Sequence, residues 1–232
     1  MDAQPFVHEA IVFLQENRQL PEVHLFSHAG RVYVGLNDVF SPQIFEDTYF
    51  FMEAVASYRP ATFLEVGCGT GLVSVACALG GAQVTATDVY GAALRNTIAN
   101  AAVHDVVDRV RVLQSDVFES VEDLSSFELV FWNVPFILVD VPVDDPLERS
   151  CFSQAYAAIG RYLAGASEVL STGGRTRFLL GFSWDSGDWT ALQELAVKVG
   201  LVIEAVGSRR LSGPSEMAFE VQLLQLNLRQ PQ

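Results

Sequence analysis

The segment Phe63–Gly71 (FLEVGCGTG) constrains the fold of this chain more than any other stretch of its sequence. An apolar run that contains Glu65 is followed by three glycines at alternating positions, Gly67, Gly69 and Gly71. A helical apolar pattern comes next and ends at two further glycines. A strand, a glycine turn and a helix in this order bring the backbone within contact distance of a ligand, because glycine has no Cβ and tolerates positive φ. A plain tight turn can show the same pattern, so the residues downstream must distinguish a ligand-binding loop from a structural turn.

The composition predicts a globular protein of the cytoplasm. Half of the 232 residues are hydrophobic and 18% are charged, which suits one α/β domain with a sizeable core. The apolar runs are too short to span a membrane, and the N-terminus lacks the basic flank of a signal peptide. Cys68, Cys77 and Cys151 form no close pair, and the histidines do not cluster near them. We therefore expect reduced thiols and no metal site.

The charge of the chain argues against nucleic-acid substrates. The formal net charge is −14, and the sequence contains no basic run. Proteins bind polyanions by placing lysine and arginine against phosphates, so a chain this poor in basic residues is a weak candidate for contact with DNA or RNA.

Two further carboxylates stand at the ends of predicted strands. The alternating segment QVTATD ends at Asp88, and RVRVLQSD ends at Asp116. The distance of Asp88 from the glycine loop suits a carboxylate that accepts hydrogen bonds from ribose hydroxyls at the tip of the neighbouring strand. Each aspartate alone could be a turn or cap residue. Two aspartates at successive strand ends, both after the glycine loop in the sequence, favour a cofactor-binding site.

Three motifs together resemble one enzyme family. The spacing of the glycine loop resembles motif I of the class I S-adenosylmethionine (SAM) methyltransferases. The segment NVPF, Asn133–Phe136, resembles the NPPY or NPPF motif of the members that act on planar nitrogen. The segment VFSPQIFEDT, residues 39–48, resembles a stretch that precedes motif I in the HemK-like branch, which methylates glutamine amide nitrogen in release factors. The resemblance covers about Val39 to Leu228.

The resemblance implies SAM as the cofactor and assigns it a set of residues. These are Thr48, Glu65, Gly67, Gly69, Gly71, Asp88, Asp116, Val117 and Asn133. At the positions of Asp116 and Val117, family members contact the adenine with the carboxylate and with the backbone amide. The residues Asp47 and Thr48 also precede a helical run, so a cap pair is the alternative interpretation there.

On the acceptor side, the resemblance makes Asn133 and Phe136 the catalytic residues. The asparagine would hold the acceptor NH₂ and the aromatic ring would stack on it. An amide nitrogen has a delocalised lone pair, so hydrogen-bond acceptors must draw its protons before it can attack. Pro135, Ser183 and Trp184 are expected to face the substrate.

The acceptor side also departs from the family pattern. Val134 replaces the first proline of the motif, so this position has an N–H and the backbone is less restricted. A glycine-rich segment with a tryptophan, usual in the HemK-like proteins, is absent. The valine argues against the classical amide acceptor, and the missing segment indicates that the substrate side has diverged from the family.

The expected fold is an α/β, Rossmann-like class I methyltransferase fold with a seven-stranded mixed sheet, an antiparallel terminal strand and flanking helices. We expect residues 1–38 to form an extension, with a helix from Phe6 to Leu14 and a hairpin around Ala29-Gly30, and residues 39–232 to form the SAM-binding domain. The segment DPLE predicts a capping box that opens a helix running from Asp145 to Leu170. A phase slip at Leu223-Leu224 predicts a bulge or burial on both faces.

The leading functional hypothesis is methyl transfer from SAM to a nitrogen of a small molecule or peptide, in secondary metabolism. A second hypothesis makes SAM the substrate: its α-amine would displace methylthioadenosine and close an azetidine ring. A third is a catalytically inert partner subunit of the same fold. We further expect a homodimer, since the N-terminal helix and hairpin present apolar groups, and neither a nucleic-acid nor a membrane partner.

Overall fold

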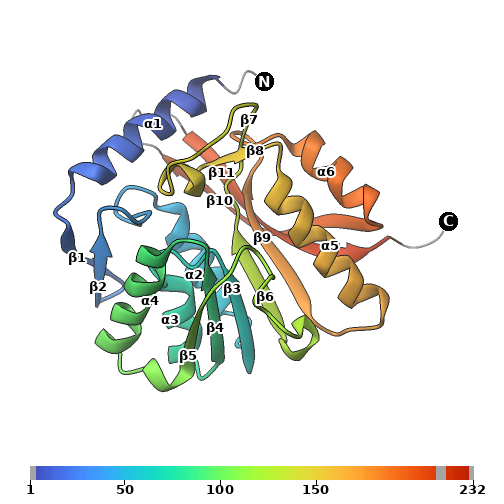
Figure 1. Cartoon of the computed structure of the whole chain (residues 1–232), viewed down its shortest axis with the longest axis horizontal. Helices are drawn as coiled ribbons and strands as arrows, with labels where there is room; N and C mark the ends of the chain where they lie inside the picture. Colours follow the sequence, from blue (N-terminus) through green and yellow to red (C-terminus); the bar gives the residue numbers. More distant parts are fainter. Residues whose placement is uncertain (1–3, 213–217, 230–232) are drawn as a thin grey trace.

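The computed structural model describes residues 4–212 and 218–229, with side chains from residue 6, and contains one mixed seven-stranded sheet within these ranges (Figure 1). The strands are β3 (Thr62–Val66), β4 (Gln83–Asp88), β5 (Val110–Gln114), β6 (Leu129–Asn133), β9 (Arg177–Ser183), β10 (Leu201–Ser212) and β11 (Ala218–Leu228). Their order is β10-β11-β9-β6-β3-β4-β5, and β11 is antiparallel to both of its neighbours. The expected Rossmann-like sheet with a reversed terminal strand is confirmed.

Helices cover both faces of this sheet (Figure 1). One face carries α2 (Asp47–Ala56), α3 (Leu72–Leu79) and α4 (Gly91–Val103), and the other carries α5 (Ala157–Ser171) and α6 (Trp189–Lys198). Short 3₁₀ turns, η1 (Val107–Arg109) and η2 (Leu124–Ser126), precede β5 and β6. A sheet covered in this way needs apolar residues on both sides of its central strands.

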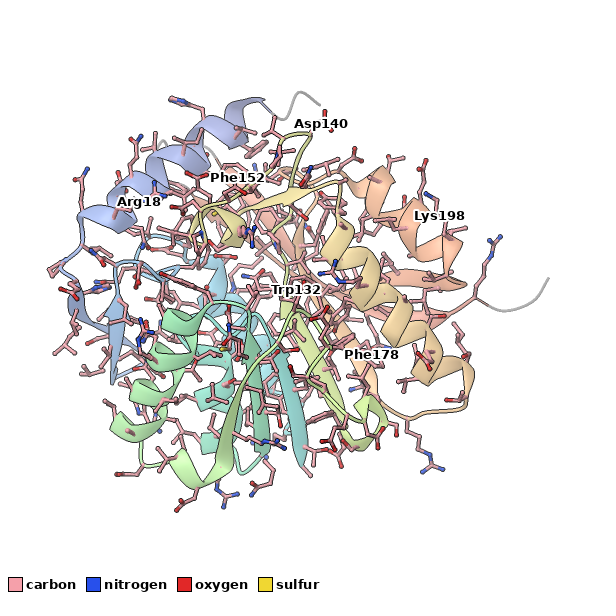
Figure 2. All side chains as sticks on the ribbon, in the orientation of Figure 1. Arg18, Trp132, Asp140, Phe152, Phe178 and Lys198 are labelled. Atoms are coloured by element: carbon pink, nitrogen blue, oxygen red, sulfur yellow. The ribbon has the colours of Figure 1, made fainter. Side chains whose placement is uncertain are left out.

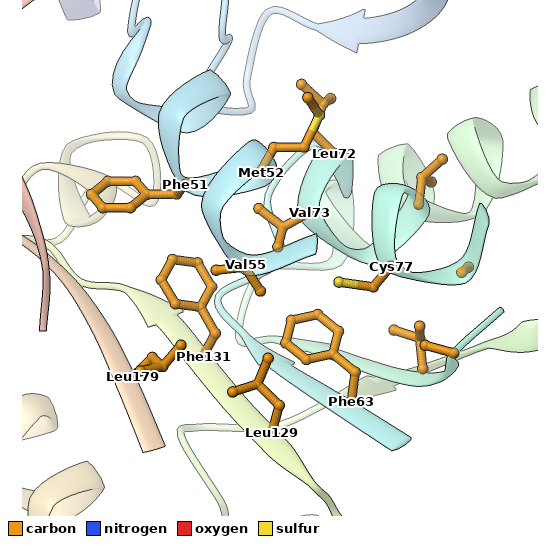
Figure 3. Close-up of a cluster of buried hydrophobic side chains, with 14 of the residues drawn as sticks. Phe51, Met52, Val55, Phe63, Leu72, Val73, Cys77, Leu129, Phe131 and Leu179 are labelled. Atoms are coloured by element: carbon orange, nitrogen blue, oxygen red, sulfur yellow. The ribbon is translucent and has the colours of Figure 1, made fainter. Parts of the chain in front are cut away.

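The central strands meet this requirement residue by residue. In β3 the fully buried Phe63 packs toward α2 and α3, whereas its neighbour Leu64 packs toward α5 and α6. Figure 3 shows the first of these clusters, in which Phe131 of β6 lies beneath Phe51 of α2 with ring centroids 5.7 Å apart. The alternation follows from the two-residue period of a strand.

The N-terminal segment forms the expected helix and hairpin. The helix α1 spans Gln4–Gln19, five residues longer than predicted at its C-terminal end, and β1 (Val23–His28) pairs with β2 (Arg31–Leu36). Positive φ angles at Ala29 (48°) and Gly30 (75°) fit a two-residue type I′ turn. The fully buried Asn17 ties α1 to residues 37–41 through three hydrogen bonds to backbone groups. The boundary at residue 38 stays a prediction.

The helix predicted from Asp145 to Leu170 is wrong in its first half. The Asp145 carboxylate does accept from two backbone N–H groups, at Leu147 and Glu148, but only the 3₁₀ turn η3 (Glu148–Ser150) follows. The next residues form β8 (Phe152–Gln154), which pairs in parallel with β7 (Ile137–Val139). Left-handed backbone at Ala155 and Tyr156 then precedes α5.

Long-range pairing explains this difference. Phe152 is buried in a cluster with Phe13 of α1 and Ile137 of β7, and Figure 2 shows Phe152 close to α1. These contacts connect residues far apart in the sequence, and they override the local capping pattern. The polar-ended segment ILVDVPVDD after Phe136 predicts a loop, but its first three residues form the strand β7.

The end of the chain agrees with its prediction. The ladder between β10 and β11 shifts register between Ala205 and Gly207, which face Leu224 and Leu223. The bulge is therefore confirmed, with the extra residue on β10, and both leucines are buried on opposite faces. The apolar segment MAFEVQLLQLNL predicts a last strand that starts at Met217, and Met217 lies outside the described residues. None of the helices in the described ranges has the length and apolar character needed to cross a bilayer.

Replacing Phe131 by alanine should lower the free energy of unfolding by about 3–5 kcal/mol, because the ring is fully buried and a cavity would remain. The measurement is urea denaturation. Ile98→Ala, at a position that is 51% exposed on α4, is the matched control and should change stability by less than about 1 kcal/mol. Equal losses in the two variants would contradict this assignment of the core.

Candidate functional site

A cavity of about 440 Å³ lies at the C-terminal ends of β3, β4, β5 and β6. The order of the sheet reverses here, with β4 and β5 on one side of β3 and β6 and β9 on the other. Open α/β sheets bind ligands at this point. The predicted site residues on its wall are Thr48, Glu65, Gly67, Gly69, Asp88, Asp116, Val117, Asn133 and Pro135. We call this space the first cavity.

The three glycines of the loop have three different surroundings. All have positive φ: 63° at Gly67, 52° at Gly69 and 80° at Gly71. A Cβ at Gly67 would lie 2.6 Å from Trp132 Nε1, so this glycine lets the indole pack on the loop. A Cβ at Gly69 would meet nothing within 4 Å, which leaves room for a ligand beside it.

Gly71 does not line the first cavity, which corrects its predicted contact with the cofactor. A Cβ there would lie 2.8 Å from the backbone Cα of Thr97. This glycine is needed for the close approach of α3 and α4 rather than for a ligand.

Glu65 is a buried carboxylate on the cavity wall, with 4% of its surface exposed. The backbone N–H and the hydroxyl of Ser74 both donate to its Oε2. Burial raises the pKa of Glu65 to about 8, although the two bonds from Ser74 act in the opposite direction. Its proton affinity is therefore sensitive to any cation that enters the cavity.

The Asp88 side chain forms hydrogen bonds to the backbone of the glycine loop and of the turn after β4. Its Oδ2 accepts from the Gly69 N–H at 3.1 Å, and its Oδ1 accepts from the Tyr90 N–H at 2.9 Å. Burial raises the pKa of Asp88, while these backbone donors act to lower it. The carboxylate thus links β4 to the loop and still faces the cavity.

Asp116 has a partner that the sequence did not reveal. Arg161 of α5 forms an ion pair with it, with Nη2 2.5 Å from Oδ1, and both side chains are about half exposed. The next residue, Val117, is buried and has φ of 52°, a left-handed conformation that is uncommon for a β-branched side chain. Strained backbone of this kind concentrates at ligand sites.

The NVPF segment keeps its turn with valine in place of the first proline. The N–H of the buried Val134 donates to the Gly181 carbonyl of β9 at 3.3 Å, so the extra donor is satisfied. The Asn133 Nδ2 donates to Asp47 Oδ2 at 2.9 Å. The Asn133 Oδ1 is buried and has no hydrogen-bond partner among the described residues. A buried acceptor without a partner is rare, so it needs an explanation.

Asp47 is the site residue that the sequence did not identify. A cap pair with Thr48 was the alternative interpretation of this position, yet the N-cap is Glu46, without a side-chain cap bond, and Asp47 is the first residue of the helix. Its side chain is 4% exposed. Burial raises its pKa to about 6, against the effect of the Asn133 hydrogen bond. A carboxylate that is buried at a helix start and bonds across to a strand end cannot be read from local sequence.

A second cavity of about 270 Å³ lies on the other side of Asn133. Asn133, Phe40 and Ser150 line both cavities, so the NVPF turn forms part of the wall between them. Phe136 lines the second cavity, and the Tyr156 hydroxyl fixes its carbonyl by donating to it at 2.5 Å.

Ser183 and Trp184 lie outside both cavities, contrary to expectation. The fully buried Ser183 donates to Ser186, and the 42% exposed Trp184 packs beside Trp189. Ser186 lines the second cavity instead, because the chain turns back after β9. In the described ranges the three cysteines are unpaired, and no group of three potential ligands is placed to hold a metal ion.

The family model of the methyltransferase small domain matches residues 32–181. A release factor glutamine methyltransferase from Rhodopirellula baltica is 39% identical over 84 residues, which is 35% of this chain and 28% of that protein. A bifunctional methyltransferase from Rickettsia bellii is 30% identical over 101 residues, 43% of this chain and 18% of that protein. The chain thus spans less than a third of the length of these two relatives.

A solved structure has the same fold at low sequence identity. The SAM-dependent methyltransferase from Agrobacterium tumefaciens superposes with a TM-score of 0.57 and 17% identity, covering 91% of this chain and 71% of that one.

Replacing Glu65 by glutamine should stabilise the protein in a pH-dependent way. The folded pKa of about 8 lies above the ordinary value of 4.5, so the contribution of Glu65 to stability is complete below about pH 4.5 and is lost as the pH rises through 8. The free energy of unfolding of the variant, relative to the native protein, should therefore rise over this range, by up to about 5 kcal/mol. Urea titrations at pH 5, 7 and 9 measure it. Glu122→Gln, on the surface, is the control, and a difference that stays constant with pH would refute the prediction.

Proposed function

Because the chain belongs to the methyltransferase small domain family, we propose that it transfers the methyl group of SAM to a nitrogen atom of a small molecule or a peptide. It is a class I, HemK-like family member whose cofactor is SAM. The observation that carries the proposal is the meeting of two cavities at Asn133, one with the glycine loop and strand-end carboxylates and the other with an apolar wall.

The residues of the first cavity fit SAM. Room beside Gly69 allows the ligand to approach the backbone, and Asp88 would accept from ribose hydroxyls while keeping its bonds to the loop. Glu65 and Thr48 would lie near the methionine part, where a carboxylate stabilises positive charge. When bound, SAM supplies an electrophilic methyl group on a sulfonium.

The Asp116 carboxylate would bind the adenine amine and Arg161 at the same time. A carboxylate has about four acceptor positions, so one oxygen can keep the arginine while the other accepts from the ligand. The buried Val117 and the indole of Trp132 would cover the adenine plane from the protein side.

Asn133 and Phe136 would hold the acceptor. Asn133 lines both cavities, so its side-chain amide would face the nitrogen of a substrate bound between them. Catalysis of an in-line displacement then comes mainly from proximity and orientation, which the wall between the cavities provides.

The second cavity also favours an external acceptor over intramolecular cyclisation of SAM, because it leaves room beside Asn133 for another molecule. The open space at Gly69 argues against an inert partner subunit. A homodimer and a role in secondary metabolism stay predictions.

Replacing Asp88 by asparagine should weaken binding of S-adenosylhomocysteine (SAH) by about 10- to 100-fold, since a hydrogen-bond acceptor with full charge is lost next to the ligand. Isothermal titration calorimetry measures it. Asp108→Asn, an exposed position in η1, removes the same charge and should leave the affinity within about twofold. Failure of the native protein to bind SAH would refute the assignment of the first cavity.

Incubation of the pure protein with SAM alone should leave SAM intact, because no acceptor occupies the second cavity. Chromatography with mass detection follows SAM, SAH and methylthioadenosine. Release of methylthioadenosine together with a cyclic amino acid would replace methyl transfer by cyclisation as the function.

A further inference from the structure

The wall of the second cavity combines aromatic rings with acidic side chains. Its charged residues in the described part of the chain are all carboxylates, with no lysine, arginine or histidine among them. Six phenylalanines line it: Phe6, Phe13, Phe40, Phe45, Phe136 and Phe219. The carboxylates are Glu9, Glu16, Glu46 and Asp47.

Such a wall selects for positive charge. Carboxylates around a cavity with apolar walls give a negative potential that is only weakly screened, and the faces of aromatic rings attract cations as well. The same wall disfavours a phosphate or carboxylate group on the substrate. The volume of about 270 Å³ lies just below the range of drug-sized sites, so the occupant is small or a single side chain.

Asp47 is the carboxylate closest to the motif that would hold the acceptor. It is bonded to Asn133 and almost fully buried, whereas Glu16 and Glu46 are exposed at the cavity rim. Cys151 lies next to it, and burial together with the charge of Asp47 raises the pKa of this thiol to about 12, so the thiol stays neutral. Glu9 reaches the cavity from α1, also buried.

We propose, on the basis of the methyl-transfer function argued above, that the second cavity binds a small primary or secondary amine as its ammonium ion and that Asp47 accepts the proton that must leave before methylation. Asp47 is then a catalytic residue, and Asn133 orients the nitrogen beside it.

The chemistry balances without a further reagent. An N–H bond of the ammonium ion breaks and the proton moves to the Asp47 carboxylate, which leaves a lone pair on nitrogen. That pair forms the bond to the methyl carbon, while the carbon–sulfur bond breaks and its electrons stay on sulfur. Burial raises the pKa of a carboxylate and lowers that of an amine, so this cavity brings the two proton affinities closer.

An amide acceptor would not use Asp47 in this way. A glutamine amide is neutral, gains nothing from the negative potential and carries no ammonium proton for Asp47. The acidic wall therefore distinguishes the amine from the amide.

Calorimetry with matched probes tests the proposal. The full chain is first titrated with SAH, which tests the first cavity by itself. The SAH-saturated protein is then titrated with 3-phenylpropylamine, an ammonium ion at pH 7.5, and with the neutral 3-phenylpropanamide. We expect the amine to bind at least about tenfold more tightly than the amide. Equal binding, tighter binding of the amide, or binding of neither probe would overturn the proposal, while the SAH result decides the proposed function separately.

A variant then assigns the effect to Asp47. Asp47→Asn removes the charge but keeps an oxygen that can accept from Asn133, so the fold should persist, and thermal unfolding checks it. The variant should lose about tenfold in affinity for the amine and change its affinity for the amide by less than about twofold. Glu122→Gln, outside both cavities, controls for net charge. An unchanged preference for the amine in Asp47→Asn would overturn the role of Asp47. The comparison of the two probes on the native chain tests the proposal even if this variant fails to fold.

Discussion

The site depends on four parallel strands that end at one edge of the sheet. Because β3, β4, β5 and β6 run in the same direction, the residues that follow their last apolar positions meet in space although they lie up to 70 residues apart in the sequence. The apolar faces of these strands hold them between two layers of helices. The polar strand ends are thereby fixed relative to one another, and the preorganisation that methyl transfer needs follows from the packing of the core.

Much of this could be predicted from the sequence, because it depends on local patterns. Alternating and continuous apolar runs located the strands, and the positions of Glu65, Asp88 and Asp116 at strand ends placed them at one edge. Glycines in the loop indicated left-handed backbone. Gly71 shows the limit of that reasoning, since its positive φ is real but its reason is the backbone of Thr97 on another helix.

The parts that could not be predicted depend on contacts between distant segments. The ion pair of Asp116 with Arg161 joins residues 45 positions apart, and the bond from Asn133 to Asp47 joins residues 86 apart. The strand β8 replaced a predicted helix because Phe152 finds partners on α1 and β7. The local preference for a helix is overridden where contacts between distant segments bury more apolar surface than the helix would.

The acceptor side of the site combines a change of backbone with a change of electrostatics. Val134 keeps the turn by giving its extra N–H to Gly181, so the loss of a proline leaves Asn133 in place. Meanwhile Asp47 is buried against that asparagine, where its raised pKa means that the ionised form destabilises the fold near neutral pH. A cationic ligand beside this carboxylate would offset that cost, because a nearby positive charge favours the ionised form. The turn that positions Asn133 is thus preserved despite the substitution at Val134. The buried carboxylate of Asp47 beside it favours an acceptor nitrogen that carries a positive charge.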